Sequence, residues 1–198
     1  MTIFPNILIT GTPGTGKTTI AKKVCELVPE YSVISVGALV KEHGFHTGRD
    51  EELDTFVLDE DPLLDFMEPM MSKGGIIVDH HDPVIFPERW FELIYVIRCD
   101  STEVHWDRLE ARKYHSFKIQ QNVEAEIHGI ISDEAHESYN PKIIFELLNT
   151  TEGHLERNVV EISRELRGIV IERKEEDEIM DKEEEDALKP RKKQAYDK

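Results

Sequence analysis

Cysteine is scarce in this sequence, with only Cys25 and Cys99 among 198 residues. Two cysteines are too few for the disulfide framework of many small secreted domains, so a reducing compartment is the simpler expectation. No apolar run approaches the roughly 20 residues that a membrane-spanning helix needs. Residues 1–6 also lack the charged and apolar regions of a secretory signal. We therefore expect a protein that is neither secreted nor membrane-spanning.

Positive charge is also in short supply. Lysine and arginine number 24 against 41 aspartates and glutamates, which gives a net charge of −17 with histidine neutral. A protein that coats nucleic acid without specificity is basic overall, so strong direct nucleic-acid binding is not expected. Because the chain is acidic, any anionic substrate has to be met by a local group of positive side chains.

Apolar residues become sparse after Ile171. Residues 172–198 contain eleven acidic and eight basic residues, and such a segment cannot bury a core. We expect one domain at residues 1–171, followed by a charged tail that is either a solvated helical extension or flexible. The tail carries three of the seventeen net negative charges, which leaves −14 on the domain. The basic cluster Lys189–Lys193 is either a nuclear-import address or part of a solubilising end.

Short apolar runs rich in β-branched residues alternate with helical patterns along the domain. Strands are expected at residues 6–10, 33–36, 75–79, 93–98 and 142–147. Helices are expected at residues 17–27, 119–130 and 155–166. The last two are predicted from apolar residues that recur every three or four positions: Ile119, Val123, Ile127 and Ile130 in one, and Leu155, Val159, Ile162 and Leu166 in the other. This alternation is typical of an α/β fold with a doubly wound, five-stranded parallel sheet and helices on both faces. Polar residues 38–57 are expected to leave the sheet at a strand end, where such folds build sites.

The turn after the first strand, Gly11–Thr18 (GTPGTGKT), matches the pattern G-x-x-x-x-G-K-[ST]. Its glycines let backbone N–H groups converge on a phosphate, and the following helix adds the positive end of its dipole. Lys17 supplies a positive charge for the β and γ phosphates, and the Thr18 hydroxyl is expected to reach Mg²⁺. The alternative, a glycine-rich turn with an idle lysine, requires four fixed positions to coincide by chance between a strand and a helix.

A P-loop enzyme also needs a carboxylate near the metal, usually at the end of another buried strand. Asp79 closes the run Gly75–Asp79, although it can instead cap the next element. If strand geometry persists, His81 faces the same way as Asp79 and His80 faces away. The His81 imidazole can then orient a water or a phosphate-bearing group, or it can serve only in packing.

Phosphoryl transfer also requires positive charge that meets the phosphate oxygens. Arg108 and Arg112 are four residues apart, so they share one helical face and are either aimed at the phosphates or paired at the surface. Arg89 is a candidate for the phosphate of a second substrate. Lys41 and Arg49 are weaker candidates, because exposed basic residues are common.

Several motifs, taken in order, resemble one family: residues 11–19 (GTPGTGKTT), 58–61 (LDED), 78–81 (VDHH), 86–91 (FPERWF), 98–100 (RCD) and 108–112 (RLEAR). That family is adenylate kinase isoenzyme 6, also called the coilin-interacting nuclear ATPase protein. The resemblance covers about residues 6–166. It implies a P-loop nucleoside monophosphate kinase with a monophosphate-binding segment at about residues 35–58 and a short lid at about 111–121.

The resemblance also implies an activity. It implies Mg²⁺-dependent transfer of phosphate from ATP to AMP, with dAMP, CMP or dCMP as lesser acceptors, and an intrinsic ATPase activity. It further implies a role in maturation of the small ribosomal subunit, through a ribosomal protein partner, in the nucleus and cytoplasm.

Carried over to this chain, the resemblance assigns ATP binding to Gly14, Gly16, Lys17, Thr18, Thr19 and Arg112. It ties Asp79 and His81 to metal and water handling, and Lys41 and Arg89 are the expected contacts of AMP. Three features depart from the family pattern, and one of them is the charged tail after Ile171, which lies outside the resemblance. Residues 37–41 read GALVK where relatives often have GDLxR, and lysine cannot reproduce the bidentate contact of arginine with phosphate. Lys113 replaces a glycine of the lid, which can alter lid flexibility.

Three functions are therefore considered. The first is a monophosphate kinase, and the second is an ATP-driven assembly switch for a ribosomal protein, whose basic surface would suit this acidic chain. The third, a P-loop kinase for a sugar acid or shikimate, is disfavoured by residues 86–90 (FPERW) and by the Asp-x-His pair.

Overall fold

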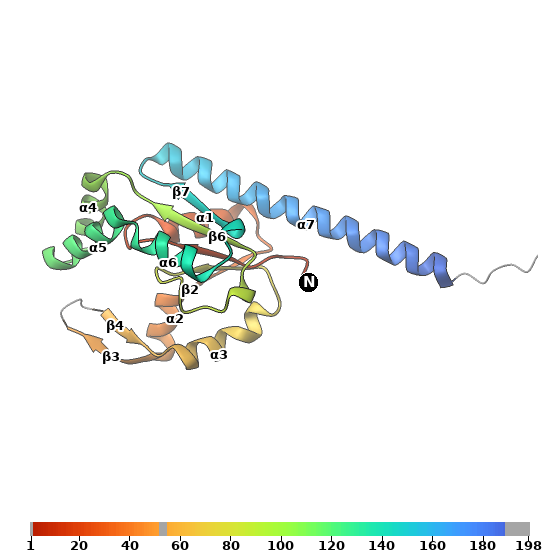
Figure 1. Cartoon of the computed structure of the whole chain (residues 1–198), viewed down its shortest axis with the longest axis horizontal. Coiled ribbons are helices and arrows are strands. Elements are labelled where there is room, and N and C mark those ends of the chain that lie inside the picture. The colour runs from red at the N-terminus through yellow and green to blue at the C-terminus, as the bar shows by residue number, and fades with distance from the viewer. Residues whose placement is uncertain (1, 52–54, 189–198) are drawn as a thin grey trace, which may run out of the picture.

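The computed structural model describes residues 2–51 and 55–188. A sheet lies at its centre, between helices (Figure 1). This sheet has five strands in the order β2-β5-β1-β6-β7, and every neighbouring pair of strands is parallel. The strands are β1 (Ile7–Thr10), β2 (Ser32–Ser35), β5 (Ile76–Asp79), β6 (Leu93–Arg98) and β7 (Ile144–Leu148). This arrangement confirms the predicted doubly wound α/β fold.

Helices cover both faces of the sheet. One face packs against α1 (Lys17–Leu27) and α7 (Glu152–Leu188). The other face packs against α2 (Val36–His43), α3 (Glu60–Met71) and α6 (Ile130–Ser138). The helices α4 (Thr102–Ala111) and α5 (Ser116–His128) pack on each other at one side of the molecule (Figure 1), and η1 (Glu88–Trp90) and η2 (Pro141–Ile143) are single 3₁₀ turns.

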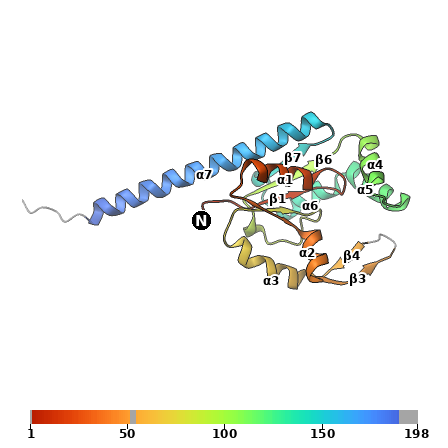
Figure 2. The ribbon, with the colours of Figure 1, turned by 180° about the vertical axis from the view of Figure 1, so that it is seen from behind.

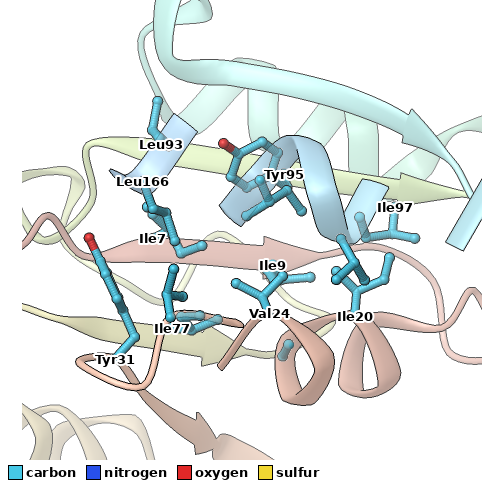
Figure 3. Close-up of a cluster of buried hydrophobic side chains, with 14 of the residues drawn as sticks. Ile7, Ile9, Ile20, Val24, Tyr31, Ile77, Leu93, Tyr95, Ile97 and Leu166 are labelled. Carbon is cyan, nitrogen blue, oxygen red and sulfur yellow. The ribbon is translucent and has the colours of Figure 1, made fainter. Parts of the chain in front are cut away.

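The central strand β1 sends alternate side chains into two hydrophobic cores. Ile7 and Ile9 lie in the core beneath α1 and α7, together with Leu166 (Figure 3). Leu8 points to the opposite core, where it joins Met67 of α3. Alternate residues of a strand face opposite sides of the sheet, so an entirely apolar strand has to be covered on both faces. This double burial fixes the end of β1, and therefore the start of the P-loop, in the middle of the sheet.

Two predicted strands are shifted at both ends in the structure, to Ser32–Ser35 and Ile144–Leu148. The strand expected at 33–36 ends at Ser35, the last residue paired with β5, and Val36 already begins α2. The strand expected at 142–147 begins two residues later, because Pro141 starts the 3₁₀ turn η2 and Ile144 is the first residue of β7.

The single helix expected at residues 119–130 is two helices in the structure. Gly129 separates α5 from α6 and has φ +69°, a left-handed conformation that glycine adopts readily. Ile119 and Val123 are buried as predicted, whereas Ile127 and Ile130 are 62% and 43% exposed. The prediction for these two residues was wrong because the chain changes direction at Gly129.

Helix α7 extends well beyond the sheet (Figure 2). Its predicted apolar positions pack on the core, and from Lys174 to Lys182 the side chains are exposed. Of the two alternatives for residues 172–198, the structure has the helical extension as far as Leu188. The basic cluster 189–193 lies outside the described residues. None of the helices in the described part of the chain combines the length and apolar character of a membrane span.

A separate antiparallel pair, β3 (His46–Asp50) and β4 (Thr55–Leu58), lies next to α2. With α2 it makes up most of residues 35–58, the expected monophosphate-binding segment. The sequence pattern predicts only a polar excursion here, and neither strand was expected from it. The β3 sequence HTGRD contains almost none of the β-branched and aromatic residues that identify strands.

Candidate active site

The P-loop follows β1 at the carboxyl end of the sheet. Gly11, Gly14 and Gly16 have φ values of +136°, +97° and +104°. A Cβ atom at Gly11 would also lie closer than 3.0 Å to the carbonyl oxygen of Ile97 in β6, where no side chain can be accommodated. The motif therefore requires glycine at positions where both the backbone conformation and the neighbouring strand exclude other residues.

Lys17 is the first residue of α1 and is only 8% exposed. Its Nζ donates hydrogen bonds to the carbonyl oxygens of Gly11 at 2.6 Å and Thr12 at 3.0 Å. An ammonium group has three donors, so one remains for a phosphate oxygen. Burial, the largest cause, lowers the pKa of Lys17 to about 8. The negative charges of Asp79 and Glu126 oppose this shift, and the positive charge of Arg112 adds to it. Because its hydrogen-bond partners here are neutral carbonyls, this buried cation suits an anionic ligand.

Thr18 and Asp79 meet beside Lys17. The Thr18 hydroxyl donates a hydrogen bond of 2.6 Å to Oδ2 of Asp79. Asp79 ends β5, the strand next to β1, and is paired in register with Ile9. Hydroxyl and carboxylate oxygens are the hard ligands that Mg²⁺ prefers, usually together with several waters. The structure thus brings together the residues expected to hold Mg²⁺, and their chemistry fits that ion.

His80 and His81 follow the end of β5, so the strand alternation assumed from the sequence stops before them. Their rings are in edge contact, with centroids 4.5 Å apart. Burial, and then the neighbouring His81, lower the pKa of His80 well below its usual range. His81 is exposed as a residue, but its imidazole lines a hollow with Lys41. Loss of water there, and the charge of Lys17, lower the pKa of His81. Both imidazoles are therefore neutral at pH 7.

One hollow, here called the Arg112 hollow, opens beside the P-loop on the side of β6 and β7. It has a volume of about 360 Å³, and its lining includes Gly14, Gly16, Thr19, Arg112, Asn149 and Glu152. Arg112 directly follows α4 as its C-cap residue and is exposed, as a lid arginine should be. Arg108 instead donates hydrogen bonds to the carbonyl oxygens of Asn149 at 2.8 Å and Thr150 at 3.0 Å. Both arginines therefore line the Arg112 hollow, but Arg108 is bound to the loop after β7, whereas Arg112 is exposed toward a nucleotide.

A second hollow, the Lys41 hollow, lies on the side of β5 and β2. It has a volume of about 650 Å³, and its lining includes Lys41, Arg49, Phe56, Tyr114 and Lys118. These residues come from α2, the β3–β4 pair and the lid. An adjoining hollow shares Lys41 and Phe56 and reaches His81. Three cationic side chains thus gather in one cavity of a strongly acidic protein, which is what an anionic substrate requires.

Arg89 lies elsewhere. It belongs to η1, which precedes β6 and is therefore at the amino edge of the sheet, opposite the P-loop. Its Nη2 donates hydrogen bonds to both carboxylate oxygens of Glu68, at 3.0 and 2.9 Å. The structure does not bring Arg89 together with the other site residues, and this placement argues against the expected contact with AMP.

Three buried polar side chains that the sequence analysis missed support the P-loop from other elements. The pairs are His105 Nε2 with the Pro13 carbonyl oxygen at 2.7 Å, Asn149 Nδ2 with the Thr15 carbonyl oxygen at 2.7 Å, and the Thr12 hydroxyl with Glu126 Oε2 at 2.5 Å. A signal did exist for two of them. Glu126 follows Ile119 and Val123 at helical spacing, and His105 precedes Leu109 by four residues, so each is a polar residue on an apolar helix face.

Comparisons with known proteins agree with this site. Residues 7–129 match the family described as AAA domain. The adenylate kinase isoenzyme 6 homolog of Schizosaccharomyces pombe is 46% identical over 161 residues, which cover 81% of this chain and 91% of that protein. The homolog of Caenorhabditis elegans is 45% identical over 160 residues, which cover 80% of this chain and 87% of that protein.

Among solved structures, a shikimate kinase from Bacteroides thetaiotaomicron superposes with a TM-score of 0.56 at 13% identity, covering 82% of this chain and 98% of that one. Similarity at this level establishes the P-loop kinase fold alone. The two sequence relatives are far more similar to this chain than that structure is. The chain therefore belongs to the adenylate kinase isoenzyme 6 family, and its function is that of a nucleotide-binding P-loop kinase.

Proposed function

We propose that this protein transfers the γ-phosphate of ATP to AMP, with dAMP, CMP and dCMP as lesser acceptors. The observation that carries the proposal is the position of the two hollows. The strand order places the Arg112 hollow on the β6–β7 side of the P-loop and the Lys41 hollow on the β5–β2 side. A donor and an acceptor that enter from the two sides would meet with their phosphates at Lys17.

The donor side would hold ATP. Backbone N–H groups around Gly14 and Gly16 would bind the phosphates, with Thr19 at the start of α1 and Arg112 at the lid. Mg²⁺ bound with ATP would be held by Thr18 and Asp79, largely through water, and would neutralise phosphate charge. Lys17 would contact the β and γ phosphates. No side-chain nucleophile is needed, because the phosphate of AMP itself attacks.

The acceptor side would hold the monophosphate. Lys41, Arg49 and Lys118 would balance its phosphate charge, and Phe56, whose ring stacks on His46, forms part of the same wall. The sequence places lysine at 41 where relatives often have arginine. Arg49 lines the same hollow and can form the bidentate contact that Lys41 cannot.

We further propose a slow intrinsic ATPase activity. When no acceptor is bound, water can take its place in the hollow that adjoins the Lys41 hollow and reaches His81. A neutral imidazole can accept a proton from that water and orient it. Replacement of His81 by alanine should then lower ATP hydrolysis while AMP-dependent transfer persists.

Family membership and the net charge of −17 support a cellular proposal. The protein would assist small-subunit maturation by binding a basic ribosomal protein, in the nucleus and cytoplasm, because acidic surfaces attract basic partners. Salt-sensitive co-purification of a small-subunit protein, together with imaging of the tagged chain, tests this part. If AMP has no effect on ADP formation while hydrolysis and partner binding persist, an ATP-driven assembly switch replaces the kinase.

The experiment that tests the kinase measures ADP formation from Mg-ATP with and without AMP. We expect AMP to stimulate the wild type, Lys17→Ala to abolish the activity, and Lys41→Ala to raise the KM for AMP with little change in the KM for ATP. Lys23→Ala is the matched control, because Lys23 is exposed on α1 and lines neither hollow. AMP-independent ADP formation by the wild type would refute the kinase proposal.

A further inference from the structure

Glu126 of α5 is a buried carboxylate that holds the P-loop from outside the motif. The residue is 4% exposed. Its Oε2 accepts a hydrogen bond from the Thr12 hydroxyl at 2.5 Å, and its Oε1 accepts bonds from Arg98 Nε and from the backbone N of Cys99, both at 2.9 Å. Both carboxylate oxygens are therefore engaged, and the negative charge is balanced by the Arg98 guanidinium.

Thr12 connects this carboxylate to Lys17. The carbonyl oxygen of Thr12 accepts the hydrogen bond from Lys17 Nζ at 3.0 Å, while its hydroxyl is bound to Glu126. The same carbonyl oxygen accepts a hydrogen bond from the Thr15 hydroxyl, also at 3.0 Å. Glu126 thus binds the side chain of Thr12, and Lys17 is bound by the carbonyl oxygen of the same residue.

Helix α5 also reaches the Lys41 hollow. Lys118, in its first turn, lines that hollow, and eight residues of helix, about 12 Å, separate it from Glu126. Between them, Ile119 and Val123 pack against Leu109 of α4 in a small hydrophobic cluster of their own. One rigid helix therefore contacts the acceptor side at one end and the P-loop near the other.

We propose that Glu126 is a positioning residue for ATP binding: through Thr12 it holds Lys17 at the phosphate site, and it ties the lid helix α5 to the P-loop. The proposal rests on the proposed binding of ATP at the P-loop. It assigns a role to a residue that lies outside the P-loop motif and the Asp-x-His pair.

The experiment is calorimetric measurement of Mg-ATP binding. Glu126→Gln should weaken binding about tenfold, by loss of the charge-assisted hydrogen bond to Thr12. Thr12→Val should weaken binding by a similar factor, and Thr12→Ser, which keeps the hydroxyl, should restore it. Glu124→Gln, the same charge change at an exposed site of α5, is the control.

The outcomes separate the two proposals. A wild type that does not bind Mg-ATP refutes the proposed function. A wild type that binds overturns the role of Glu126 if the affinity of Glu126→Gln is unchanged, or if that affinity falls while Thr12→Val and Thr12→Ser bind equally well. If Glu126→Gln does not fold, the two Thr12 variants test the proposal. An affinity for Mg-ATP at least about fivefold lower in Thr12→Val than in Thr12→Ser supports the proposal, and equal affinities overturn it.

Discussion

Replacement of Gly11 by alanine tests the claim that the fold reserves this position for glycine. The new Cβ would lie closer than 3.0 Å to the carbonyl oxygen of Ile97 and 3.2 Å from the carbon and nitrogen of that residue. Ile97 belongs to β6, which is bonded to β1 on one side and β7 on the other, so its backbone cannot move away without disturbing the sheet.

The cost can be worked out from two contributions. Overpacking against a rigid neighbour costs about 1–3 kcal/mol, and a φ of +136° adds about 1–2 kcal/mol for a residue with a Cβ. We therefore expect Gly11→Ala to lower the free energy of unfolding by about 2–5 kcal/mol. For a chain of this length, that corresponds to a decrease in Tm of roughly 5–20 °C.

Gly168→Ala is the matched control. Gly168 lies in the middle of α7, and a Cβ built there meets no atom within 4 Å apart from the backbone of its own helix. Alanine in a helix interior is about 0.5–1 kcal/mol more stable than glycine, so the same chemical change should here raise stability. Urea unfolding measures both, as midpoint shifts at constant m value. A Gly11→Ala midpoint equal to that of the wild type would refute the steric argument.

Four further predictions concern charged residues of the site. Without nucleotide, Lys17→Met should have a free energy of unfolding about 3 kcal/mol higher than the wild type at pH 7, because burial lowers the pKa of Lys17 from 10.5 to about 8 in the folded state. Between these two pKa values the unfolded wild type binds more protons than the folded one, so the stability of the wild type rises with pH. The difference between the two proteins should therefore close by about pH 10.5. A difference independent of pH in urea unfolding would contradict this. Asp79→Asn keeps an acceptor for the Thr18 hydroxyl but loses the negative charge. In steady-state assays the rate of ADP formation should therefore fall about a hundredfold, and a higher Mg²⁺ concentration should be needed. Unchanged kinetics would show that Asp79 does not belong to the metal site. Arg108→Lys loses the double contact with the carbonyl oxygens of Asn149 and Thr150, so it should lower the free energy of unfolding by about 1–3 kcal/mol. Arg112→Lys should instead raise the KM for ATP and leave the free energy of unfolding unchanged. Arg89→Ala should leave the KM for AMP unchanged, and a large increase would mean that its pairing with Glu68 is not its main role.

Features that depend on local sequence were predictable. The run Gly11–Thr18 makes a phosphate-binding turn through its own backbone, so the motif alone identifies it. Asp79 was also predictable, because the carboxyl ends of neighbouring parallel strands meet at one edge of the sheet. The helix break at Gly129 was missed because the apolar spacing continues through a residue at which the chain turns.

Arg89 and Arg49 show where local patterns give no answer. Both are exposed arginines outside the P-loop, and the sequence ranked Arg89 higher because it follows a strand and matches a family motif. The structure places Arg89 on the amino edge, paired with Glu68, and Arg49 in the Lys41 hollow. An exposed cation carries no periodic signal, so its surroundings depend on how distant elements pack.

By itself, the sequence determined the α/β class, the P-loop and the residues that follow the central strands, because periodicity and motif act over a few neighbouring residues. Only the tertiary structure decided which other groups surround the phosphates. Lys41, Arg49 and Lys118 come from three separate elements, and Glu126 reaches Thr12 across 114 residues of chain. Such contacts arise from the packing of helices on the sheet, which no local pattern specifies.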